Sequence, residues 1–413
     1  VATHNCIMKT KRLLSLLQLA FLLPRLSAYI SPTGTGASRQ RRSTSLRSAG
    51  TPPASGIVSF PPTIASTEED LVSTVVAPPV SSTVLSFDPL PPALSPDRPD
   101  PSFLRTLWRF TRPHTIIGSL LAIPAISFLS LPSLLPPDIF AFLFSIGRAM
   151  VPALLMNLYI TGLNQITDVE IDKVNKPDLV IPAGDLRLRD ASFIVVVAGL
   201  LGCLGGFGRT SSGGLRLVLW GSALLGTAYS LPPIRLKRFP LLAATSIVVV
   251  RGTLINVGFY QHAISALSSR APQSILSCLF DPRCALSSLY FGLFGIVIAL
   301  MKDVPDVRGD ALMKIQSFSV RIGQQRIFKA ARRLLAVLFG ITSGGLMAGA
   351  CVAPSQLIAA CRASIGVAAA CMGYSVRKKA QDVNPEDSQE VYNYYMYLWK
   401  LFYLSYFALP FAK

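Results

Sequence analysis

Nine long apolar runs, joined by polar connections, restrict what this chain can fold into. At ~20 residues for each bilayer crossing, these runs predict about nine helices. The predicted fold class is therefore all-α: a multi-pass transmembrane helical bundle of about nine helices around a central cavity. The runs lie near residues 115–132, 142–163, 192–208, 216–231, 241–262, 286–301, 334–351, 355–373 and 396–411.

The composition favours a membrane protein over a soluble enzyme. Hydrophobic residues make up 51% of the chain and charged residues only 15%, with a mean hydropathy of +0.49. These values are too apolar for a soluble globular chain of 413 residues. The net charge of +18 comes from cations scattered among the apolar runs, so it does not indicate nucleic acid as a partner. The expected surroundings are a lipid bilayer.

The N-terminal quarter predicts targeting segments ahead of the membrane domain. Residues 1–28 place Lys9, Lys11 and Arg12 before a short apolar core, as in a signal peptide. Residues 29–56 are basic and free of acids, which is typical of a transit peptide, and residues 57–101 form a Pro- and Ser-rich linker. A signal peptide followed by a transit peptide indicates transport to a plastid membrane. Residues 102–413 then form the transmembrane domain. A disordered tail with one hydrophobic patch is the alternative.

Basic residues are distributed unevenly over the connections between the runs. The connections after the second, fourth, sixth and eighth runs share one compartment if successive crossings alternate in direction. They hold most of the loop cations, so the positive-inside rule places this side in the stroma of a plastid. The cations are Lys173, Lys176, Arg187, Arg189, Arg235, Lys237, Arg238, Arg308, Lys314, Arg321, Arg377, Lys378 and Lys379.

A first polar stripe continues the second apolar run into the stretch NQITDVEIDKVNKP. Asn157, Thr161, Asn164, Asp168 and Asp172 are separated by intervals of four, three, four and four residues. This spacing places them on one narrow face of a helix. A polar stripe within lipid must face a protein interior.

A second cluster, KDVPDVRGD, follows the sixth run. Asp303, Asp306 and Asp310 have offsets of three and four, which again gives one face if the helix continues past Pro305. Both clusters leave the membrane in the same compartment. Their concentration is notable in a chain with only 21 acidic residues.

Carboxylates gathered around one cavity repel each other unless a divalent cation joins them. Mg²⁺ prefers a few carboxylates together with the phosphate oxygens of a substrate. The two clusters therefore predict a Mg²⁺ site for a diphosphate, and the expected metal ligands are Asp168, Asp172, Asp303, Asp306 and Asp310. Solvated charges at helix ends, paired with nearby bases, are the alternative interpretation.

Cations near the two clusters are candidates for binding the substrate. In YSLPPIRLKRF, the two prolines hold Arg235, Lys237 and Arg238 toward the same side, where they can neutralise a leaving diphosphate. Ordinary positive-inside charge would explain them equally simply. Arg251 lies inside an apolar run and is expected to face the cavity and bind a substrate carboxylate, or to form a structural ion pair.

The two aspartate stretches resemble those of the UbiA-type intramembrane prenyltransferases, over about residues 105–413. Within that superfamily, six blocks in order are similar to the plastid and cyanobacterial homogentisate prenyltransferases. The blocks are DVEIDKVNKP, AYSLPPIRLKRFP, VVVRGTLINVGFY, KDVPDVRGD, IQSFSVRIG and YLWKLFYLSYFALPF.

This resemblance implies a Mg²⁺-dependent transfer of a prenyl group to homogentisate with decarboxylation. Phytyl is the favoured group, as in tocopherol biosynthesis, and solanesyl transfer toward plastoquinone is the alternative. By motif position, it implies that Asn164 helps the aspartates to hold Mg²⁺ and the prenyl diphosphate. Two other classes stay open: a membrane transporter and a non-catalytic quinone-binding protein. Neither the oligomeric state nor the length of the prenyl donor follows from the sequence.

Overall fold

The computed structural model describes residues 102–132, 136, 138–208, 211–267 and 273–412. Within these ranges the chain is helical, with turns and short connections and no strand. The predicted all-α fold is confirmed. The three targeting and linker segments predicted for residues 1–28, 29–56 and 57–101 lie outside the described residues.

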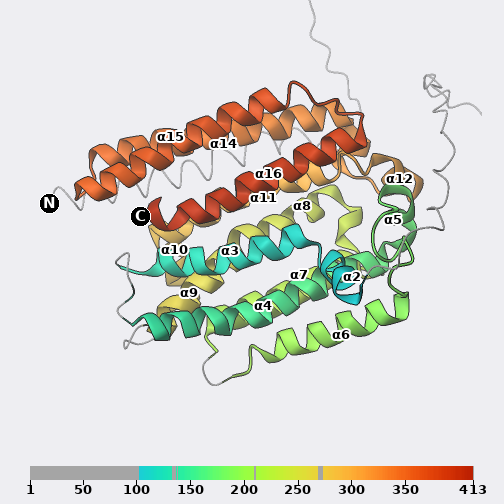
Figure 1. Ribbon diagram of the computed structural model, residues 1–413, viewed down its shortest axis with the longest axis horizontal. Helices are drawn as coiled ribbons and strands as arrows, with labels where there is room; N and C mark the ends of the chain where they lie inside the picture. Colours follow the sequence, from blue (N-terminus) through green and yellow to red (C-terminus); the bar gives the residue numbers. More distant parts are fainter. Residues whose placement is uncertain (1–101, 133–135, 137, 209–210, 268–272, 413) are drawn as a thin grey trace, which may run out of the picture. The chain divides into compact units, whose positions relative to one another are not determined.

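Each of the nine predicted runs corresponds to a helix or a continuous set of helices (Figure 1). In chain order these are α3 (Pro113–Ser130), α4 (Ile139–Thr167), α6 (Leu188–Leu204), α7 (Gly213–Ser230), α8 (Pro240–Val248) with η2 (Val249–Leu254) and α9 (Ile255–Leu267), α11 (Pro282–Lys302), α14 (Gln324–Cys351), α15 (Gln356–Lys379) and α16 (Ser388–Ala408). Shorter helices connect them: α2 (Phe103–Phe110), α5 (Val169–Asn175), η1 (Leu236–Arg238), α10 (Ile275–Phe280), α12 (Val307–Leu312), α13 (Phe318–Ile322) and η3 (Leu409–Ala412).

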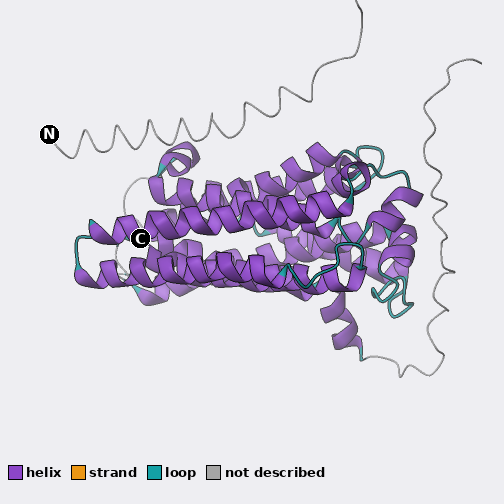
Figure 2. Ribbon diagram, turned by 90° about the horizontal axis from the view of Figure 1, so that it is seen from above, coloured by secondary structure: helices purple, strands orange, loops and turns teal. Residues whose placement is uncertain are grey.

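The long helices run lengthwise through the molecule, with loops gathered at its ends (Figure 2). Six of them, α3, α4, the α8–α9 set, α11, α14 and α15, are long and apolar enough to cross a membrane. The remaining three, α6, α7 and α16, pack beside these; α6 lies along α4, and α16 contacts α3 and α11. The bundle therefore has the dimensions of a membrane domain.

The outer surface is apolar where a soluble protein would be polar. Phe140, Leu224 and Phe193 have more than two thirds of their surface exposed (82%, 75% and 71%). Side chains of this size are expected outside only where lipid or a partner covers them. Exposed apolar side chains on these long helices are therefore consistent with a bilayer around the bundle.

The interior is built from aromatic side chains of α11 and α16. The ring of Phe291 stacks on that of Tyr406 with their centroids 3.8 Å apart, and Phe294 meets Phe402 edge-on at 5.1 Å. Such pairs stabilise a core beyond the area that they bury. They fix α16 against α11, two helices that lead into the polar end described next.

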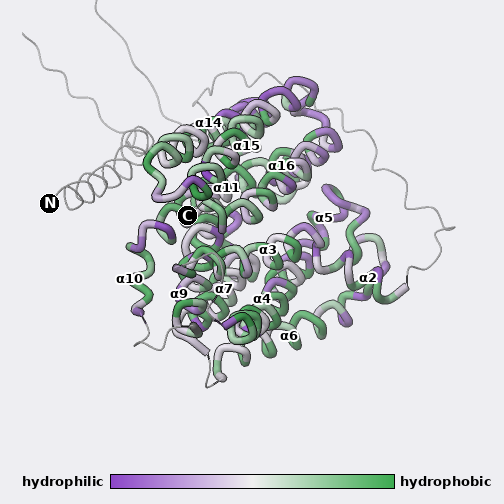
Figure 3. The backbone as a smooth tube through the Cα atoms, turned by 60° about the vertical axis from the view of Figure 1, so that its left-hand side comes forward, coloured by the Kyte–Doolittle hydropathy of each residue, from purple (hydrophilic) through white to green (hydrophobic). Residues whose placement is uncertain are grey.

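Polar residues gather at one end of the bundle. Figure 3 colours α5 hydrophilic, and α5 and α12 lie side by side at the right-hand end in Figure 1. The connection between α15 and α16 reaches the same end, where the Ser388 hydroxyl donates to the backbone oxygen of Pro305 (3.2 Å). The four connections predicted to share one compartment thus meet at one end of the molecule.

Candidate active site

The first carboxylate cluster lies at the junction of α4 and α5. Helix α4 ends at Thr167, Asp168 has a non-helical backbone, and α5 begins at Val169. The helix is therefore interrupted where the sequence predicted one continuous face. The backbone N–H of Asp172 still donates to the oxygen of Asp168 (2.8 Å), so the two side chains remain one turn apart.

The second cluster has a similar break. Helix α11 ends at Lys302, and α12 begins only at Val307, so the helix does not continue past Pro305 as a single face would require. Asp303 caps α11 and Asp306 caps α12. The two breaks allow α5 and α12 to turn toward each other across the end of the bundle.

Asn175 joins the two clusters. Its side-chain N–H donates to the backbone oxygen of Asp306 (3.0 Å), and its side-chain oxygen accepts from the backbone N–H of Gly309 (2.7 Å). A Cβ atom on Gly309 would lie 2.5 Å from the Asn175 side chain, so only glycine permits this approach. Residues more than 130 positions apart in the sequence thereby form one site.

The clusters enclose one small pocket of about 60 Å³. Of the residues predicted from the sequence, seven line it: Asn164, Asp168, Asp172, Lys237, Asp303, Asp306 and Asp310. Other lining residues were not singled out as ligands: Arg112, Ile171, Asn175, Lys176, Tyr229, Ala243, Lys302, Ile315 and Ser317. A pocket of this size holds water or an ion but must open to admit a diphosphate.

Four of the five aspartates have a basic partner of their own. Lys237 and Arg235 (2.8 Å) both pair with Asp168, and Lys176 pairs with Asp306. The other two contacts are longer: Arg112 to Asp172 at 3.8 Å and Lys302 to Asp303 at 3.6 Å. The charges are balanced within the pocket, because unpaired carboxylates buried together would be strongly destabilising.

Two carboxylate oxygens are left without hydrogen bonds. Oδ2 of Asp172 and Oδ1 of Asp306 are buried and accept no hydrogen bond. Buried acceptors without partners are uncommon and suggest a missing ion or water. Within the described ranges, no three His, Cys, Asp or Glu side chains converge on one metal position, so a cation here would need further ligands from a substrate. This chemistry fits Mg²⁺, which keeps phosphate or water oxygens among its ligands.

Burial shifts the ionisation of these groups. It raises the pKa of Asp172 to about 6 and that of Asp310 to about 7, where the charges of Asp303 and Asp306 add to the effect. It also raises the pKa of Asp303 and lowers that of Lys237 to about 8, despite the nearby Asp168. A bound cation would oppose the raised carboxyl pKa values.

The other predicted residues lie apart from the pocket lining. Arg235 is next to it through its bond to Asp168, whereas Arg238 is exposed. Arg251 lies deeper in the bundle, in the π-helical segment η2, with its guanidinium over the rings of Trp399 (4.8 Å) and Phe402 (5.5 Å). Its role as a carboxylate ligand stays a prediction.

The basic residues that sequence reasoning missed stand next to the motifs that it used. Lys176 follows α5, Lys302 precedes Asp303, and Arg112 belongs to the segment RFTRPHT before α3. Tyr229 accepts a hydrogen bond from Lys302 (3.1 Å). Their positions beside the aspartates were visible in the sequence, but the way they pair with individual carboxylates depends on the two helix breaks.

In the part of the chain that the structure describes, an apolar helical bundle of membrane-spanning length carries a pocket of paired aspartates and cations at its polar end. Residues 120–401 match the model of the UbiA prenyltransferase family. The chain belongs to this family, and it is a prenyltransferase.

Several characterised relatives are similar over most of their length. Homogentisate phytyltransferase 1 of Arabidopsis thaliana is 37% identical, over 75% of this chain and 76% of that protein. Homogentisate phytyltransferase of Synechocystis is 35% identical, over 75% of this chain and 96% of that protein. The homogentisate solanesyltransferase of Arabidopsis thaliana is 32% identical, over 75% and 77%. The apo structure of a UbiA homologue from Aeropyrum pernix K1 shares the fold, with a TM-score of 0.50, 16% identity and coverage of 71% and 95%.

The raised carboxyl pKa values predict pH-dependent metal binding. In the metal-free protein the folded state holds protons on Asp172 and Asp310 more tightly than the unfolded state does, so their contribution to stability falls as pH rises from about 4 through 7. Because a cation must displace these protons, we expect the apparent Mg²⁺ affinity to be at least about tenfold lower at pH 5.5 than at pH 8. Titration of Mg²⁺ followed by thermal unfolding measures this difference.

Two variants control the measurement. Asp310→Asn should weaken the pH dependence between about pH 6 and 8, whereas Asp190→Asn, at an exposed position on α6, should leave it unchanged. A Mg²⁺ affinity that is the same at both pH values would contradict the assignment of these carboxyls as ligands.

Proposed function

We propose that this protein transfers a prenyl group from a prenyl diphosphate to homogentisate, with Mg²⁺ as cofactor and phytyl as the preferred group. The observation that carries the proposal is the convergence of the two aspartate clusters on one pocket, with buried oxygens of Asp172 and Asp306 left free to bind a cation. Two phytyltransferases are 37% and 35% identical to this chain, two geranylgeranyltransferases are 34% identical and a solanesyltransferase is 32% identical. Membership of an enzyme family removes the support for the transporter and scaffold alternatives.

The first step of the proposed reaction breaks the bond between the allylic carbon and the diphosphate oxygen. The diphosphate leaves with both electrons of that bond. When bound, Mg²⁺ neutralises this leaving group and lowers the barrier to its departure. Carboxylates from the two clusters, Asp168 and Asp172 on one side and Asp303, Asp306 and Asp310 on the other, would share the ion with oxygens of the diphosphate.

The cations of the pocket have a second task in this proposal. Lys176 and Lys237 line the pocket and Arg235 lies next to it, and all three pair with carboxylates in the metal-free protein. Fixed positive charge in a pocket closed to bulk water stabilises a developing anion more than it would in water. These side chains therefore offset the charge that the diphosphate gains.

The second step forms a carbon–carbon bond to the aromatic ring. An electron-rich ring carbon of homogentisate attacks the allylic carbon. Overall, the ring loses one proton, the carboxyl group leaves as CO₂, and the carbon that carried it takes up a proton to become a methyl group. The aromatic and aliphatic interior of the bundle keeps water away from the allylic cation and surrounds the prenyl tail.

Arg251 is the proposed site for the acceptor carboxylate. No carboxylate pairs with it among the described side chains; its neighbours are aromatic rings of α16. His114 meets Trp399 edge-on (5.1 Å) and lies two residues after Arg112 of the pocket, so Arg251 lies one aromatic layer below the aspartates. The guanidinium would bind the carboxylate of the acceptor through paired hydrogen bonds.

The homologues named chloroplastic support a plastid membrane as the location. We propose further that the carboxylate end of the bundle faces the stroma, because the four basic connections meet there.

A product assay tests the proposed reaction. Membranes that contain the whole chain are supplied with homogentisate, Mg²⁺ and a mixture of phytyl, geranylgeranyl and solanesyl diphosphates, and the products are identified by mass spectrometry. We expect a methyl-phytyl-benzoquinol as the main product, and none from Asp306→Asn. A solanesyl product would contradict the phytyl preference and assign the protein to plastoquinone synthesis. No product with any donor would contradict homogentisate as the acceptor.

A second assay tests Arg251. Arg251→Gln removes a charge-assisted hydrogen bond, so we expect the KM for homogentisate to rise by about tenfold to a hundredfold while the KM for the prenyl diphosphate changes little. Arg251→Lys, which keeps the charge, should recover part of the loss. An equal rise in both KM values would assign Arg251 a structural role instead.

A further inference from the structure

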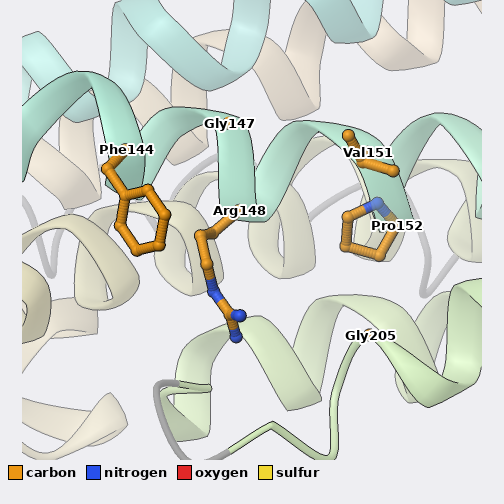
Figure 4. Close-up of a pocket in the computed structure, with 6 residues that line it drawn as sticks. All are labelled: Phe144, Gly147, Arg148, Val151, Pro152 and Gly205. Carbon is orange, nitrogen blue, oxygen red and sulfur yellow. The ribbon is translucent and has the colours of Figure 1, made fainter.

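A second, larger groove lies on helix α4, away from the carboxylates. It has a volume of about 480 Å³ and is lined by Phe144, Gly147, Arg148, Val151, Pro152 and Gly205. In Figure 4, the Arg148 side chain extends from α4 toward the segment after α6, with Phe144 on one side and Val151 and Pro152 on the other. We call this site the α4 groove. It combines apolar walls with one cation.

Among the described residues, no carboxylate forms a salt bridge with Arg148. Its Nε atom is buried and has no hydrogen-bond partner there. The nearby His262 already bonds to Ser212 (3.0 Å) and to the backbone oxygen of Ser145 (3.3 Å). A cation without a protein partner on a helix surrounded by lipid attracts a ligand with negative charge.

Gly147 keeps the α4 groove open. It lies inside a 29-residue helix, where glycine is less favourable than alanine. A Cβ atom here would have no other atom within 4 Å, so no neighbouring helix requires the glycine. The missing side chain instead leaves space beside Arg148. By contrast, a Cβ on Gly205 would lie 2.3 Å from Pro152, so Gly205 serves close packing at the floor.

The level of Arg148 along α4 indicates the kind of ligand. Arg148 precedes Asp168 by 20 residues on the same helix, which corresponds to about 30 Å at 1.5 Å per residue. The hydrocarbon core of a bilayer is also about 30 Å thick. If the aspartates lie at one boundary of the membrane, Arg148 lies near the opposite boundary, where lipid headgroups are found.

We propose that the α4 groove binds an anionic membrane lipid, with its phosphate on Arg148 and an acyl chain along Val151 and Pro152. Phe144 and Val151 expose 65% and 62% of their surface on the helix face that lipid would cover. The guanidinium of an arginine binds a phosphate group through two parallel hydrogen bonds. It therefore holds a phosphate headgroup more specifically than the ammonium group of a lysine does. The site is separate from the prenyl transfer pocket.

Native mass spectrometry of the whole chain tests this proposal. The protein is purified in mild detergent and mixed with equal amounts of phosphatidylglycerol and phosphatidylcholine, and the lipids retained are counted. We expect the wild type to retain phosphatidylglycerol in preference, and Arg148→Gln to retain at least fivefold less. Gly147→Leu places a side chain in the groove, and its Cβ atom meets no other atom within 4 Å, so it should lose the lipid to a similar extent while keeping the charge.

Arg216→Gln is the matched control, because Arg216 is an exposed cation near the start of α7, outside the groove. It should retain phosphatidylglycerol as the wild type does. Equal retention by Arg148→Gln and the wild type would overturn the proposal, as would equal retention of the two lipids. Displacement of phosphatidylglycerol by excess inorganic phosphate would show that the site binds a phosphate group without recognising the lipid, and would also contradict the proposal.

Discussion

Five aspartates lie in one small pocket and repel each other electrostatically. The arrangement of basic side chains at the polar end of the protein depends on this repulsion. In a region of low dielectric constant, unpaired carboxylates at such distances would be strongly destabilising. The structure balances four of them with cations from four segments of the chain: Arg112, Lys176, Lys302, and Arg235 with Lys237. Burial, with the charges of the neighbouring aspartates adding to it, raises the pKa values of Asp172 and Asp310. A pocket balanced in this way can bind a divalent cation and an anionic substrate together. The carboxylates then bind the cation, while the lysines and arginines bind the substrate.

The apolar bundle has two roles toward that pocket. Helices α4 and α11 lead to the two clusters at the same end of the bundle. There, Asn175 links the short helix α5 to the start of α12 through two hydrogen bonds. Below them, aromatic side chains of α11 and α16 form a dry interior that suits a prenyl chain and a reactive allylic cation. Arg251 is held over the ring of Trp399 in the π-helical segment η2.

Much of this arrangement could be predicted from the sequence. The apolar runs located the long helices because length and hydrophobicity alone decide whether a segment suits lipid. The spacing of Asp168 and Asp172, and of Asp303, Asp306 and Asp310, predicted their meeting because each set follows a helix that ends on the same side. The breaks at Asp168 and Pro305 were missed, since a helical offset of three or four residues survives a short interruption. The basic partner of each carboxylate, such as Lys176 for Asp306, could not be predicted from the sequence either, because the pairing depends on how α5 and α12 dock.

The central claim is that both aspartate clusters act on one substrate. A double-mutant cycle on kcat/KM with Asp168→Asn and Asp306→Asn tests it directly, because residues that act as a unit are strongly non-additive. If one metal-bound diphosphate joins the clusters, each single variant should lose about as much activity as the double variant. Losses that multiply would show that the two clusters act independently, and would contradict the shared site.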